Sequence, residues 1–366
     1  MVQFWKKAAV LTAAGVLAAM SVTGCSGSID TDAVVATVGD EDITLGVANF
    51  YARMMQGQYE TYYASMMGTT AEEMWVQDAG DGKTYEESMK DSILENLENL
   101  YVISQHAADY EVSLTEDEQK AIEDAAAKFS EDNTDDAKEI VSGYQKHIEK
   151  FLELSTIQNK MDSKMREGVD EEVSDEEAAQ KSMQYVYFSY TTTDDTGNST
   201  ELTDEEKENL KTSAQSLADR VKNGEDLETV AGELGVEVQT ATFDSESTTP
   251  NENLVTAADA LAAEGDVTDV VETDSGLYVA KLTSLLDREA TDQEKTNIIE
   301  QRKQDQYDSL LEEWRDASDI KVNEKVWKKV DFDDTGVTII TSQEETSGDG
   351  ATDGAAAEDG SADTAE

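Results

Sequence analysis

Few side chains in this sequence have the type and spacing that catalysis or metal binding requires. The two histidines, His106 and His147, fall within helical patterns, and neither has a cysteine or a second histidine at ligand spacing. We therefore interpret both as ordinary helix residues and expect no metal site and no cofactor. The sequence also lacks the common nucleotide-binding, zinc-hydrolase and serine-hydrolase motifs, and no pair of carboxylates is singled out by spacing.

The only cysteine, Cys25, follows a segment that is typical of an export signal. Lys6 and Lys7 precede an apolar run over residues 8–20, which is too short to span a membrane comfortably. The run ends in Val-Thr-Gly-Cys, which resembles a bacterial lipobox, where the cysteine receives a diacylglyceryl group. An uncleaved membrane anchor is the alternative.

We expect residues 1–24 to be a lipoprotein signal peptide and residues 25–32 to be a lipidated cysteine with a short polar tether. Lipidation of Cys25 would leave no free thiol, which excludes disulfides, thiol catalysis and cysteine-based metal sites. Two or three acyl chains, at roughly 0.8 kcal/mol for each buried methylene, would hold the protein stably on a membrane.

The charge of the chain excludes one class of partner. There are 82 acidic and 28 basic residues, and the formal net charge is −54. Without a basic patch to neutralise phosphates, the protein is not expected to bind nucleic acid. The charge could attract basic, unfolded polypeptide, or it could serve solubility alone. Residues 341–366 are acidic and poor in large apolar side chains, which predicts a disordered acidic tail.

The most informative stretch is residues 256–282. Residues 257–263 are rich in alanine and leucine, which predicts a short helix that ends just before a glycine. Residues 267–271 predict a short β-strand, and residues 274–276 predict a tight turn. Residues 277–282, Leu-Tyr-Val-Ala-Lys-Leu, predict a strand that enters a core. The order is therefore helix, glycine turn, strand, tight turn and strand.

This order resembles the second half of a parvulin, or PpiC-type rotamase, domain. The positions that match the family pattern are Ala257, Ala258, Leu261, Gly265, Val267, Val271, Thr273 and Gly276. Upstream, residues 183–190 predict an aromatic strand, Thr203 caps a long helix, and residues 227–234 predict a shorter helix, as in the first half of that domain. We expect a parvulin-like β-α-β domain over residues 181–288.

The resemblance implies peptidyl-prolyl cis-trans isomerase activity and places tyrosines where the family has two histidines. The first falls on Tyr185, or on Tyr187 if the register slips by two, and the second falls on Tyr278. The slot for the proline ring is expected to involve Leu254, Pro250, Phe243 and Leu261. Asp244 is a candidate for the family's acidic or thiol position.

Two interpretations of the tyrosines remain open. A tyrosine pair could keep a hydrogen-bonded network in the slot, although it cannot titrate near neutral pH as histidine does. Alternatively, Tyr185 and Tyr278 are core aromatics in a domain that has lost catalysis.

The rest of the chain predicts a mostly helical domain over residues 33–180. A short β-hairpin pattern opens it, and apolar residues recur at helical spacing in residues 88–110 and 142–165. Thr115 begins a capping box between them. This region resembles the chaperone domain of PrsA- and SurA-type foldases. In those families the chain returns after the parvulin domain, and residues 289–340 fit that part, with a helix predicted from Thr291 to Trp314 that Thr291 and Glu294 cap.

We thus expect an α+β fold in which a discontinuous helical chaperone domain, built from N-terminal and C-terminal parts, encloses a parvulin-like domain. Residues 51–75 are rich in tyrosine and methionine, which favours either an ordinary helix core or an apolar groove for non-native chains.

The resemblance implies an extracytoplasmic foldase that is lipid-anchored to the cell membrane and binds unfolded or newly secreted proteins. It also allows a homodimer. The alternative is a non-catalytic holdase or partner-binding surface lipoprotein on a parvulin frame.

Overall fold

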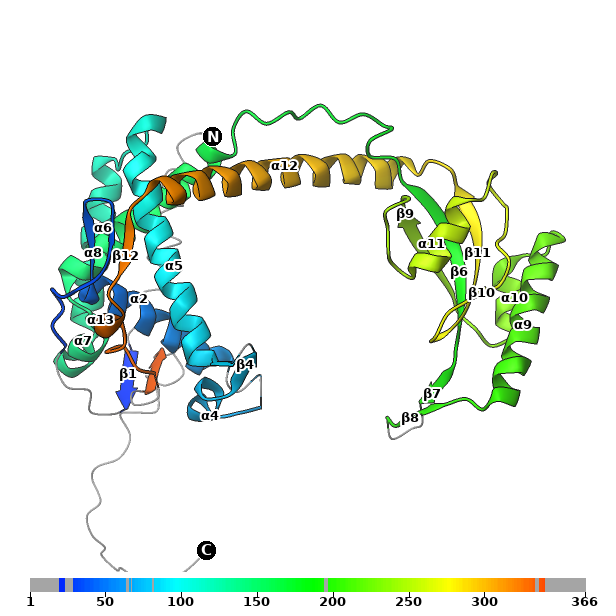
Figure 1. Ribbon diagram of the computed structural model, residues 1–366, viewed down its shortest axis with the longest axis horizontal. Coiled ribbons are helices and arrows are strands. Elements are labelled where there is room, and N and C mark those ends of the chain that lie inside the picture. Colours follow the sequence, from blue (N-terminus) through cyan, green and yellow to red (C-terminus); the bar gives the residue numbers. More distant parts are fainter. Residues whose placement is uncertain are drawn as a thin grey trace, which may run out of the picture. The chain divides into compact units, whose positions relative to one another are not determined.

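The chain forms two units (Figure 1). The computed structural model describes residues 20–23, 29–63, 66, 68–80, 82–193, 197–332 and 336–339. Unit 1 contains residues 1–167 and 306–366, and unit 2 contains residues 168–305. The predicted α+β class is confirmed, and so is the interruption of a helical part by a β-rich part. Cys25 and residues 341–366 lie outside the described residues, so the predicted lipidation and acidic tail stay predictions.

Unit 1 is built mainly from helices. Its strands are β1 (Met20–Thr23), β2 (Val34–Val38), β3 (Glu41–Thr44), β4 (Asp78–Gly80), β5 (Lys83–Thr84), β12 (Ile320–Val322) and β13 (Gly336–Ile339). Its helices are α2 (Leu45–Gln58), the π-helix η2 (Tyr59–Tyr63), α4 (Ala71–Trp75), α5 (Tyr85–His106), the 3₁₀-helix η3 (Ala107–Tyr110), α6 (Glu116–Asp132), α7 (Asp135–Val141), α8 (Gln145–Met165) and α13 (Glu324–Trp327). Thr115 forms the predicted capping box with Glu118 at the start of α6, and Thr84 forms another at the start of α5.

Segments from both ends of the chain meet in one sheet of unit 1. The helix α12 (Arg288–Ala317) leads from unit 2 back to unit 1, and β12 then pairs antiparallel with β2, with Ile320 opposite Val38. The strand β2 also pairs with β3. The helical part is therefore discontinuous in sequence, as the resemblance implied.

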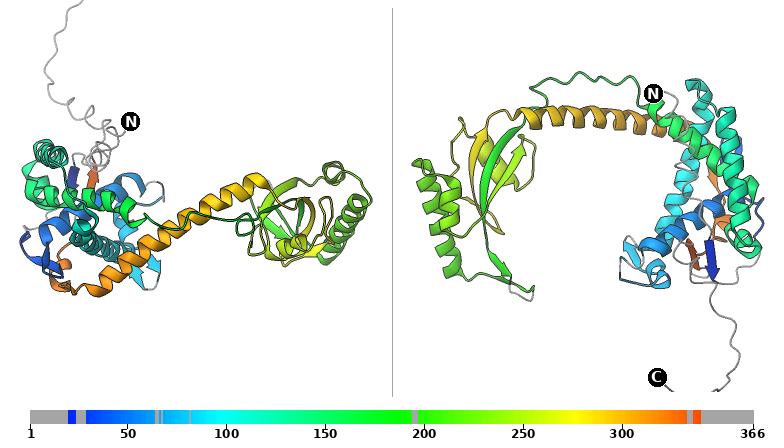
Figure 2. Two further views of the ribbon diagram at one scale, coloured as in Figure 1. Left: turned by 90° about the horizontal axis from the view of Figure 1, so that it is seen from above. Right: turned by 180° about the vertical axis from the view of Figure 1, so that it is seen from behind.

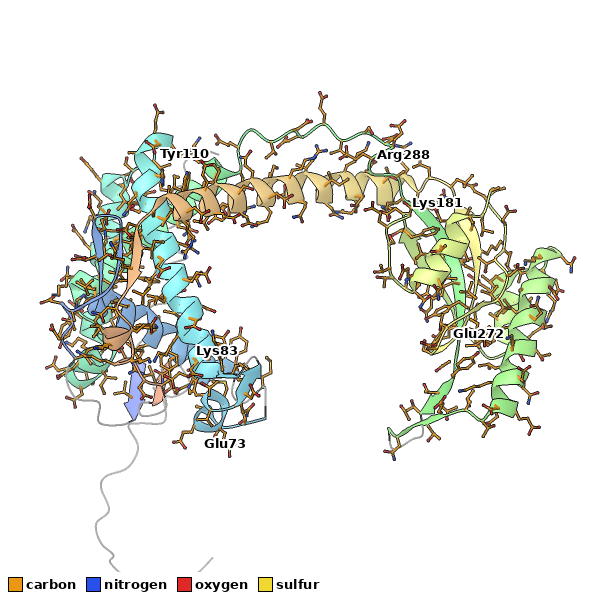
Figure 3. The ribbon with its side chains drawn as sticks, in the orientation of Figure 1. Glu73, Lys83, Tyr110, Lys181, Glu272 and Arg288 are labelled. Carbon is orange, nitrogen blue, oxygen red and sulfur yellow. The ribbon has the colours of Figure 1, made fainter. Side chains whose placement is uncertain are left out.

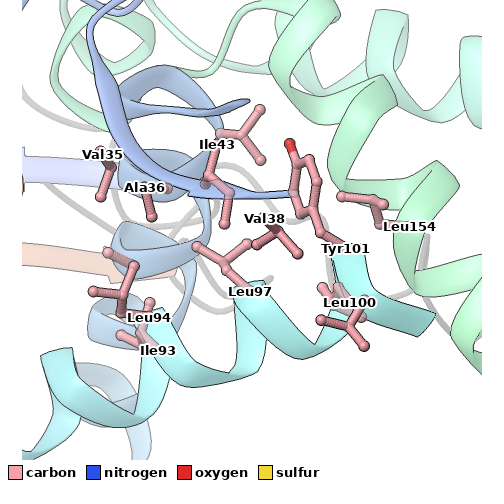
Figure 4. Close-up of a cluster of buried hydrophobic side chains, with 14 of the residues drawn as sticks. Val35, Ala36, Val38, Ile43, Ile93, Leu94, Leu97, Leu100, Tyr101 and Leu154 are labelled. Atoms are coloured by element: carbon pink, nitrogen blue, oxygen red, sulfur yellow. The ribbon is translucent and has the colours of Figure 1, made fainter. Parts of the chain in front are cut away.

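The core of unit 1 lies between this sheet and the long helices (Figure 4). Val35 and Val38 from β2, Leu97 and Tyr101 from α5, and Leu154 from α8 belong to one apolar cluster and are at most 1% exposed. Full burial of such a side chain contributes about 1.5–3 kcal/mol, so this packing is what positions the helices.

Unit 2 is a four-stranded antiparallel sheet with helices on both faces. Its elements are β6 (Lys181–Ser189), β7 (Thr191–Thr193), β8 (Ser199–Glu201), α9 (Asp204–Lys222), α10 (Leu227–Glu233), β9 (Val238–Phe243), α11 (Glu252–Asp259), β10 (Val271–Glu272) and β11 (Gly276–Ser284). The strand order is β10-β11-β6-β9. Figures 1 and 2 show α11 on one side of the sheet and the pair α9 and α10 on the other.

Two predicted helices have different bounds in the structure. The helix predicted over residues 257–263 is α11, which begins earlier because the side chain of Asn251 accepts hydrogen bonds from the N–H groups of Asn253 and Leu254. The prediction that Thr291 caps α12 is wrong. Thr291 lies inside α12 and is fully buried, and its hydroxyl accepts the N–H of Gln180 at 3.1 Å.

Among the described residues, no helix combines the length and the apolar character that crossing a membrane requires.

Candidate functional site

Two neighbouring strands of unit 2 bring three tyrosines onto one face of the sheet. Strands β6 and β11 pair antiparallel, with Tyr187 directly opposite Tyr278 and Tyr185 opposite Ala280. Successive side chains of a strand point to opposite faces, so Tyr185 and Tyr187 lie on the same face, and Tyr278 lies beside them. We call Tyr185, Tyr187 and Tyr278 the tyrosine face.

The alternate residues of the same strands face the other way. Val186, Phe188, Leu277 and Val279 pack against α9 and α10 in a separate apolar cluster. The helices α9 and α10 thereby hold one face of the sheet. The tyrosine face lies on the other side, where Tyr185 and Tyr278 are 7% and 8% exposed and share a cluster with residues of α11.

The three rings of the tyrosine face are in contact with one another. The ring centroids of Tyr187 and Tyr278 are 4.5 Å apart with an interplanar angle of 28°, which is a stacked pair. The centroids of Tyr185 and Tyr278 are 6.2 Å apart and the rings are tilted by 46°. Such aromatic pairs contribute about 0.5–1.5 kcal/mol beyond the burial of their area, so the rings hold one another in place.

Gly276 allows the ring of Tyr187 to lie close to the turn between β10 and β11. A Cβ atom at Gly276 would be 2.2 Å from the carbonyl oxygen of Phe188 and 2.6 Å from Cε2 of Tyr187. The hydroxyl of Tyr187 donates a hydrogen bond to the carbonyl oxygen of Ser275 at 2.6 Å. Only glycine fits at this position without displacing the strand or the ring.

The three hydroxyl groups differ in their partners. Tyr185 donates to Oε1 of Gln239, which lies on β9, and Tyr187 donates to Ser275 as described. Within the part of the chain that the structure describes, the hydroxyl of Tyr278 has no protein hydrogen-bond partner. Tyr278 is therefore the O–H donor of this face that a ligand carbonyl could accept from.

Electrostatics keep these hydroxyls neutral. Burial raises the pKa of Tyr185 above its ordinary value. Burial also raises the pKa of Tyr278, and the adjacent Tyr187 and Tyr185 raise it further. Both groups are thus protonated donors at neutral pH, and neither can act there as a general base.

Apolar side chains lie beside and beneath the tyrosines. Leu254 from α11 and Phe243 from β9 are fully buried in the same cluster as Tyr185 and Tyr278. Leu261 is half-buried and packs against that cluster. The structure thus brings these predicted slot residues together, with Leu254 and Phe243 as the floor. Pro250 is half-buried in the turn before α11.

The helix α11 is fastened at both ends. Asn251 caps its first turn, as described above. At the other end, Nζ of Lys181, at the start of β6 (Figure 3), donates to the carbonyl oxygen of Asp259 at 2.8 Å and lies 2.9 Å from its carboxylate. These contacts determine where Leu254 sits relative to the sheet.

Asp244, the candidate for the acidic position, is occupied by other contacts. Its carboxylate accepts hydrogen bonds from the side chains of Gln180 at 2.9 Å and Ser247 at 2.8 Å. Burial raises its pKa, but these hydrogen bonds, with those from backbone N–H groups, outweigh burial and lower it. Asp244 therefore organises the loop after β9.

Three features of the site are understood only from the structure. The alternation in residues 183–190 signals that Tyr185 and Tyr187 share a face, but the register with β11 is needed to pair Tyr187 with Tyr278. The contact of Tyr185 with Gln239 depends on the pairing of β6 with β9, which no local pattern encodes. Gly276 matched the family pattern, and its physical role is the close approach of Tyr187.

The described residues also contain a polar hollow and two histidines. A polar hollow of about 790 Å³ lies near α9 and the β10–β11 turn, where Nζ of Lys211 forms an ion pair of 2.6 Å with Glu272 (Figure 3). His106 stacks on Trp314 with centroids 4.2 Å apart, and His147 is buried in unit 1. No group of three or more His, Cys, Asp or Glu side chains among the described residues could hold a metal ion.

A known family model matches part of the sheet and one residue of the tyrosine face, Tyr278. The model of the rotamase family, the PPIC-type PPIase domain, matches residues 193–284. The match includes β9, α11 and β11, and thus Tyr278, Leu254 and Phe243, and it begins after β6. Unit 2 contains a domain of this class.

The chain is also similar to several solved structures, at low sequence identity and low TM-scores. The foldase protein PrsA from Streptococcus pneumoniae str. Canada MDR_19A is 19% identical, with 69% of this chain and 97% of that chain covered and a TM-score of 0.30. PrsA from Bacillus cereus is 15% identical, with 70% of this chain and 97% of that chain covered and a TM-score of 0.31. One of the SurA-like chaperones PEB4 and Cj1289 of Campylobacter jejuni is 12% identical, with 80% of this chain and 99% of that chain covered and a TM-score of 0.27. A comparison with curated proteins gives no match.

Proposed function

We propose that this protein is an extracytoplasmic foldase, anchored to the cell membrane through lipidated Cys25, whose unit 2 binds and isomerises X-Pro segments on the tyrosine face. The observation that carries this proposal is the hydroxyl of Tyr278, which lies unpartnered beside Tyr185 and Tyr187 over an apolar floor. The match of residues 193–284 to the PPIC-type domain supports it.

Isomerisation breaks no covalent bond, so the site has to favour the twisted amide over the planar one. The barrier is near 20 kcal/mol, and a twisted amide is stabilised by polar groups that meet it and by removal from water. We assign the apolar floor to the proline ring and the Tyr278 hydroxyl to a carbonyl oxygen of the bound segment. Gln239 and Ser275 hold Tyr185 and Tyr187 in fixed positions beside it.

Unit 1 is assigned to the capture of non-native chains. In the region of residues 51–75, Met54, Met74 and Trp75 are buried and belong to the core, as one of the two interpretations held. Tyr62, Tyr63 and Met66 are exposed by 55%, 44% and 73%. Exposed aromatic and methionine side chains close together suit the binding of varied apolar segments.

The second candidate is a non-catalytic holdase or partner-binding lipoprotein on the same frame. It is favoured by the binding of two of the three hydroxyls to protein acceptors, which leaves one donor for a ligand. In either case the partners we propose are unfolded or newly secreted proteins, and a homodimer stays a proposal from the sequence resemblance.

The site is tested by titration of a short peptide with a Phe-Pro bond into the ¹⁵N-labelled chain. We expect amide shift changes that centre on β11 and β6 around Tyr278 and Tyr187. The Tyr278→Phe variant, which keeps the ring, should bind about tenfold more weakly, which corresponds to about 1.4 kcal/mol. Tyr190→Phe is the matched control, because Tyr190 directly follows β6 and packs in the opposite cluster.

Shift changes that centre on the polar hollow near α9, with equal affinity for both variants, would contradict this placement of the site.

A further inference from the structure

The last described residues of unit 1 are held in part by side chains that bind their main chain. After α13, the described residues 328–332 and 336–339 contact α2, η2 and α5, and we call them the C-terminal segment. Val330, Phe332 and Val337 of this segment are at most 2% exposed. Among the described residues its strand β13 pairs only with β1, which lies within the predicted signal peptide, so cleavage before Cys25 would remove this partner. Other main-chain groups of the segment need partners outside this strand pair.

Side chains of unit 1 bind six main-chain groups of this segment. Three of these side chains donate to carbonyl oxygens of the segment: Nζ of Lys90 to that of Val330, Nη1 of Arg53 to that of Asp331 at 2.9 Å, and Nε2 of Gln56 to that of Phe332 at 3.3 Å. Three accept N–H groups of the segment: Oε1 of Glu86 accepts that of Phe332 at 3.1 Å, Oε2 of Glu60 that of Val337 at 2.8 Å, and Oγ1 of Thr61 that of Ile339 at 2.8 Å. We call these side chains the docking surface.

This pattern is that of a bound peptide. Inside a domain, most main-chain groups bond to other main-chain groups. A surface of side chains that binds carbonyl and N–H groups does not depend on the sequence of the segment it holds, as in the capture of extended peptides through their main chain. The docking surface would therefore accept another extended chain in the same way.

Phe332 is the side chain that gives this contact its selectivity. Its ring is 2% exposed, its centroid lies 4.9 Å from that of Trp75, and the guanidinium carbon of Arg53 is 5.7 Å from it. The indole of Trp75 is held by Glu60, whose Oε1 accepts its N–H at 2.8 Å. The position thus suits an aromatic ring against an indole and a cation.

The contact is incompletely satisfied. Nε of Arg53 and Nε1 of Trp327 are buried without a hydrogen-bond partner among the described residues. A buried donor without a partner destabilises the state that contains it. Both atoms lie where the C-terminal segment meets unit 1, so the docked state is less favourable than a fully matched core would be.

We propose that the C-terminal segment is an exchangeable internal ligand, and that the docking surface, once released, binds an extended polypeptide that carries an aromatic residue. This inference rests on the proposed capture of non-native chains and names a site for it. The occupant seen here, with its main-chain contacts and its Phe332 anchor, defines the chemistry of the chain that replaces it.

The test uses a fluorescent peptide with the sequence of residues 328–339 and the full-length protein. In Phe332→Ala the internal ligand loses its anchor, so fluorescence anisotropy should show at least tenfold tighter peptide binding than in the unsubstituted protein. Phe188→Ala is the matched control, because Phe188 is as buried as Phe332 but lies in unit 2, in a cluster that contains no residue of the C-terminal segment. It should bind the peptide as the unsubstituted protein does.

A peptide with alanine in place of its phenylalanine should bind Phe332→Ala at least tenfold more weakly. Equal binding of the peptide to all three proteins, with their folds intact by circular dichroism, would overturn the proposal. So would equal binding of the two peptides.

A second measurement on the unsubstituted protein covers the case in which Phe332→Ala fails to fold. In native-state hydrogen exchange, the amides of Phe332, Val337 and Ile339 should exchange at least a hundredfold faster than those of Leu97 and Ile103 in the core of α5, through opening of the segment alone. Exchange of both groups of amides at one common rate would show a permanent part of the core and refute exchangeability.

The two proposals fail separately. The peptide assay needs no proline and no isomerase activity, so a negative result there leaves the tyrosine face untouched, and an inactive tyrosine face leaves the docking surface untouched.

Discussion

Tyr278 and His147 show how burial decides what a titratable side chain can do in this protein. On the tyrosine face, burial raises the pKa of Tyr278, so the group stays a neutral donor at neutral pH. In unit 1, burial lowers the pKa of His147 to about 4, and the positive charge of Lys146 adds to this, while Asp32 opposes it. The Nε2 atom of His147 has no hydrogen-bond partner among the described residues.

His147 should make unit 1 sensitive to acid. Its folded pKa of about 4 lies below the unfolded value of 6.5, so the neutral ring stabilises the fold above pH 6.5, and this contribution is lost as the pH falls toward 4. Between pH 7.5 and 4.5 the loss should be about 2 kcal/mol. The measurement is urea unfolding of the unsubstituted protein and His147→Gln at both pH values.

The readout is the difference between the two proteins, because the many carboxylates titrate in both. The free energy of unfolding of the unsubstituted protein should fall by about 2 kcal/mol more than that of His147→Gln. An equal fall in both would show that the buried imidazole is not the cause.

At the scale of elements, α11 carries the floor of the site and depends on one cap. Asn251 accepts hydrogen bonds from the N–H groups of Asn253 and Leu254, and Leu254 is fully buried under the tyrosine face. The helix is only eight residues long, so its first turn is a large part of it.

Asn251→Ala should destabilise unit 2 by about 1 kcal/mol, because two N–H groups of α11 lose their acceptor. Thermal unfolding followed by circular dichroism measures this. Asn253→Ala provides the control, since Asn253 is the second residue of the helix, and its change should stay within about 0.5 kcal/mol. Equal effects of the two changes would argue against the cap.

The sequence predicts the fold of unit 2 better than its exact bounds. The capping boxes at Thr115 and Thr203 are predictable because a threonine and a glutamate three residues later form a local contact. Alanine propensity alone places the start of α11 too late, because the side chain of Asn251 caps an earlier turn. The predicted cap at Thr291 does not form, because this residue is buried in a tertiary contact with Gln180.

The candidate site was predictable in part for the same reason. Tyr278 and the candidate pair Tyr185 and Tyr187 followed from the resemblance and from strand alternation, which are properties of the local sequence. Which tyrosine lies opposite Tyr278 depends on the register between strands almost a hundred residues apart, and the hydroxyl partners depend on β9 and the β10–β11 turn. Those contacts arise only in the folded sheet.

At the scale of the whole molecule, the chain separates two tasks. Unit 1 exposes aromatic and methionine side chains and docks its own C-terminal segment, while unit 2 holds the tyrosine face in a PPIC-type domain. The net charge of −54 disfavours nucleic acid, and it fits either basic, unfolded partners or a role in solubility alone. The account predicts a foldase whose isomerase step depends on a tyrosine hydroxyl rather than on a titrating histidine.

The central claim is tested most directly by a prolyl isomerase assay on the full-length protein, with peptides that vary the residue before proline. The account predicts isomerisation above the uncatalysed rate, a loss of about tenfold in kcat/KM for Tyr278→Phe, and no loss for Tyr190→Phe. No acceleration for any peptide, with both variants folded by circular dichroism, would contradict it and leave a binding module on a parvulin frame.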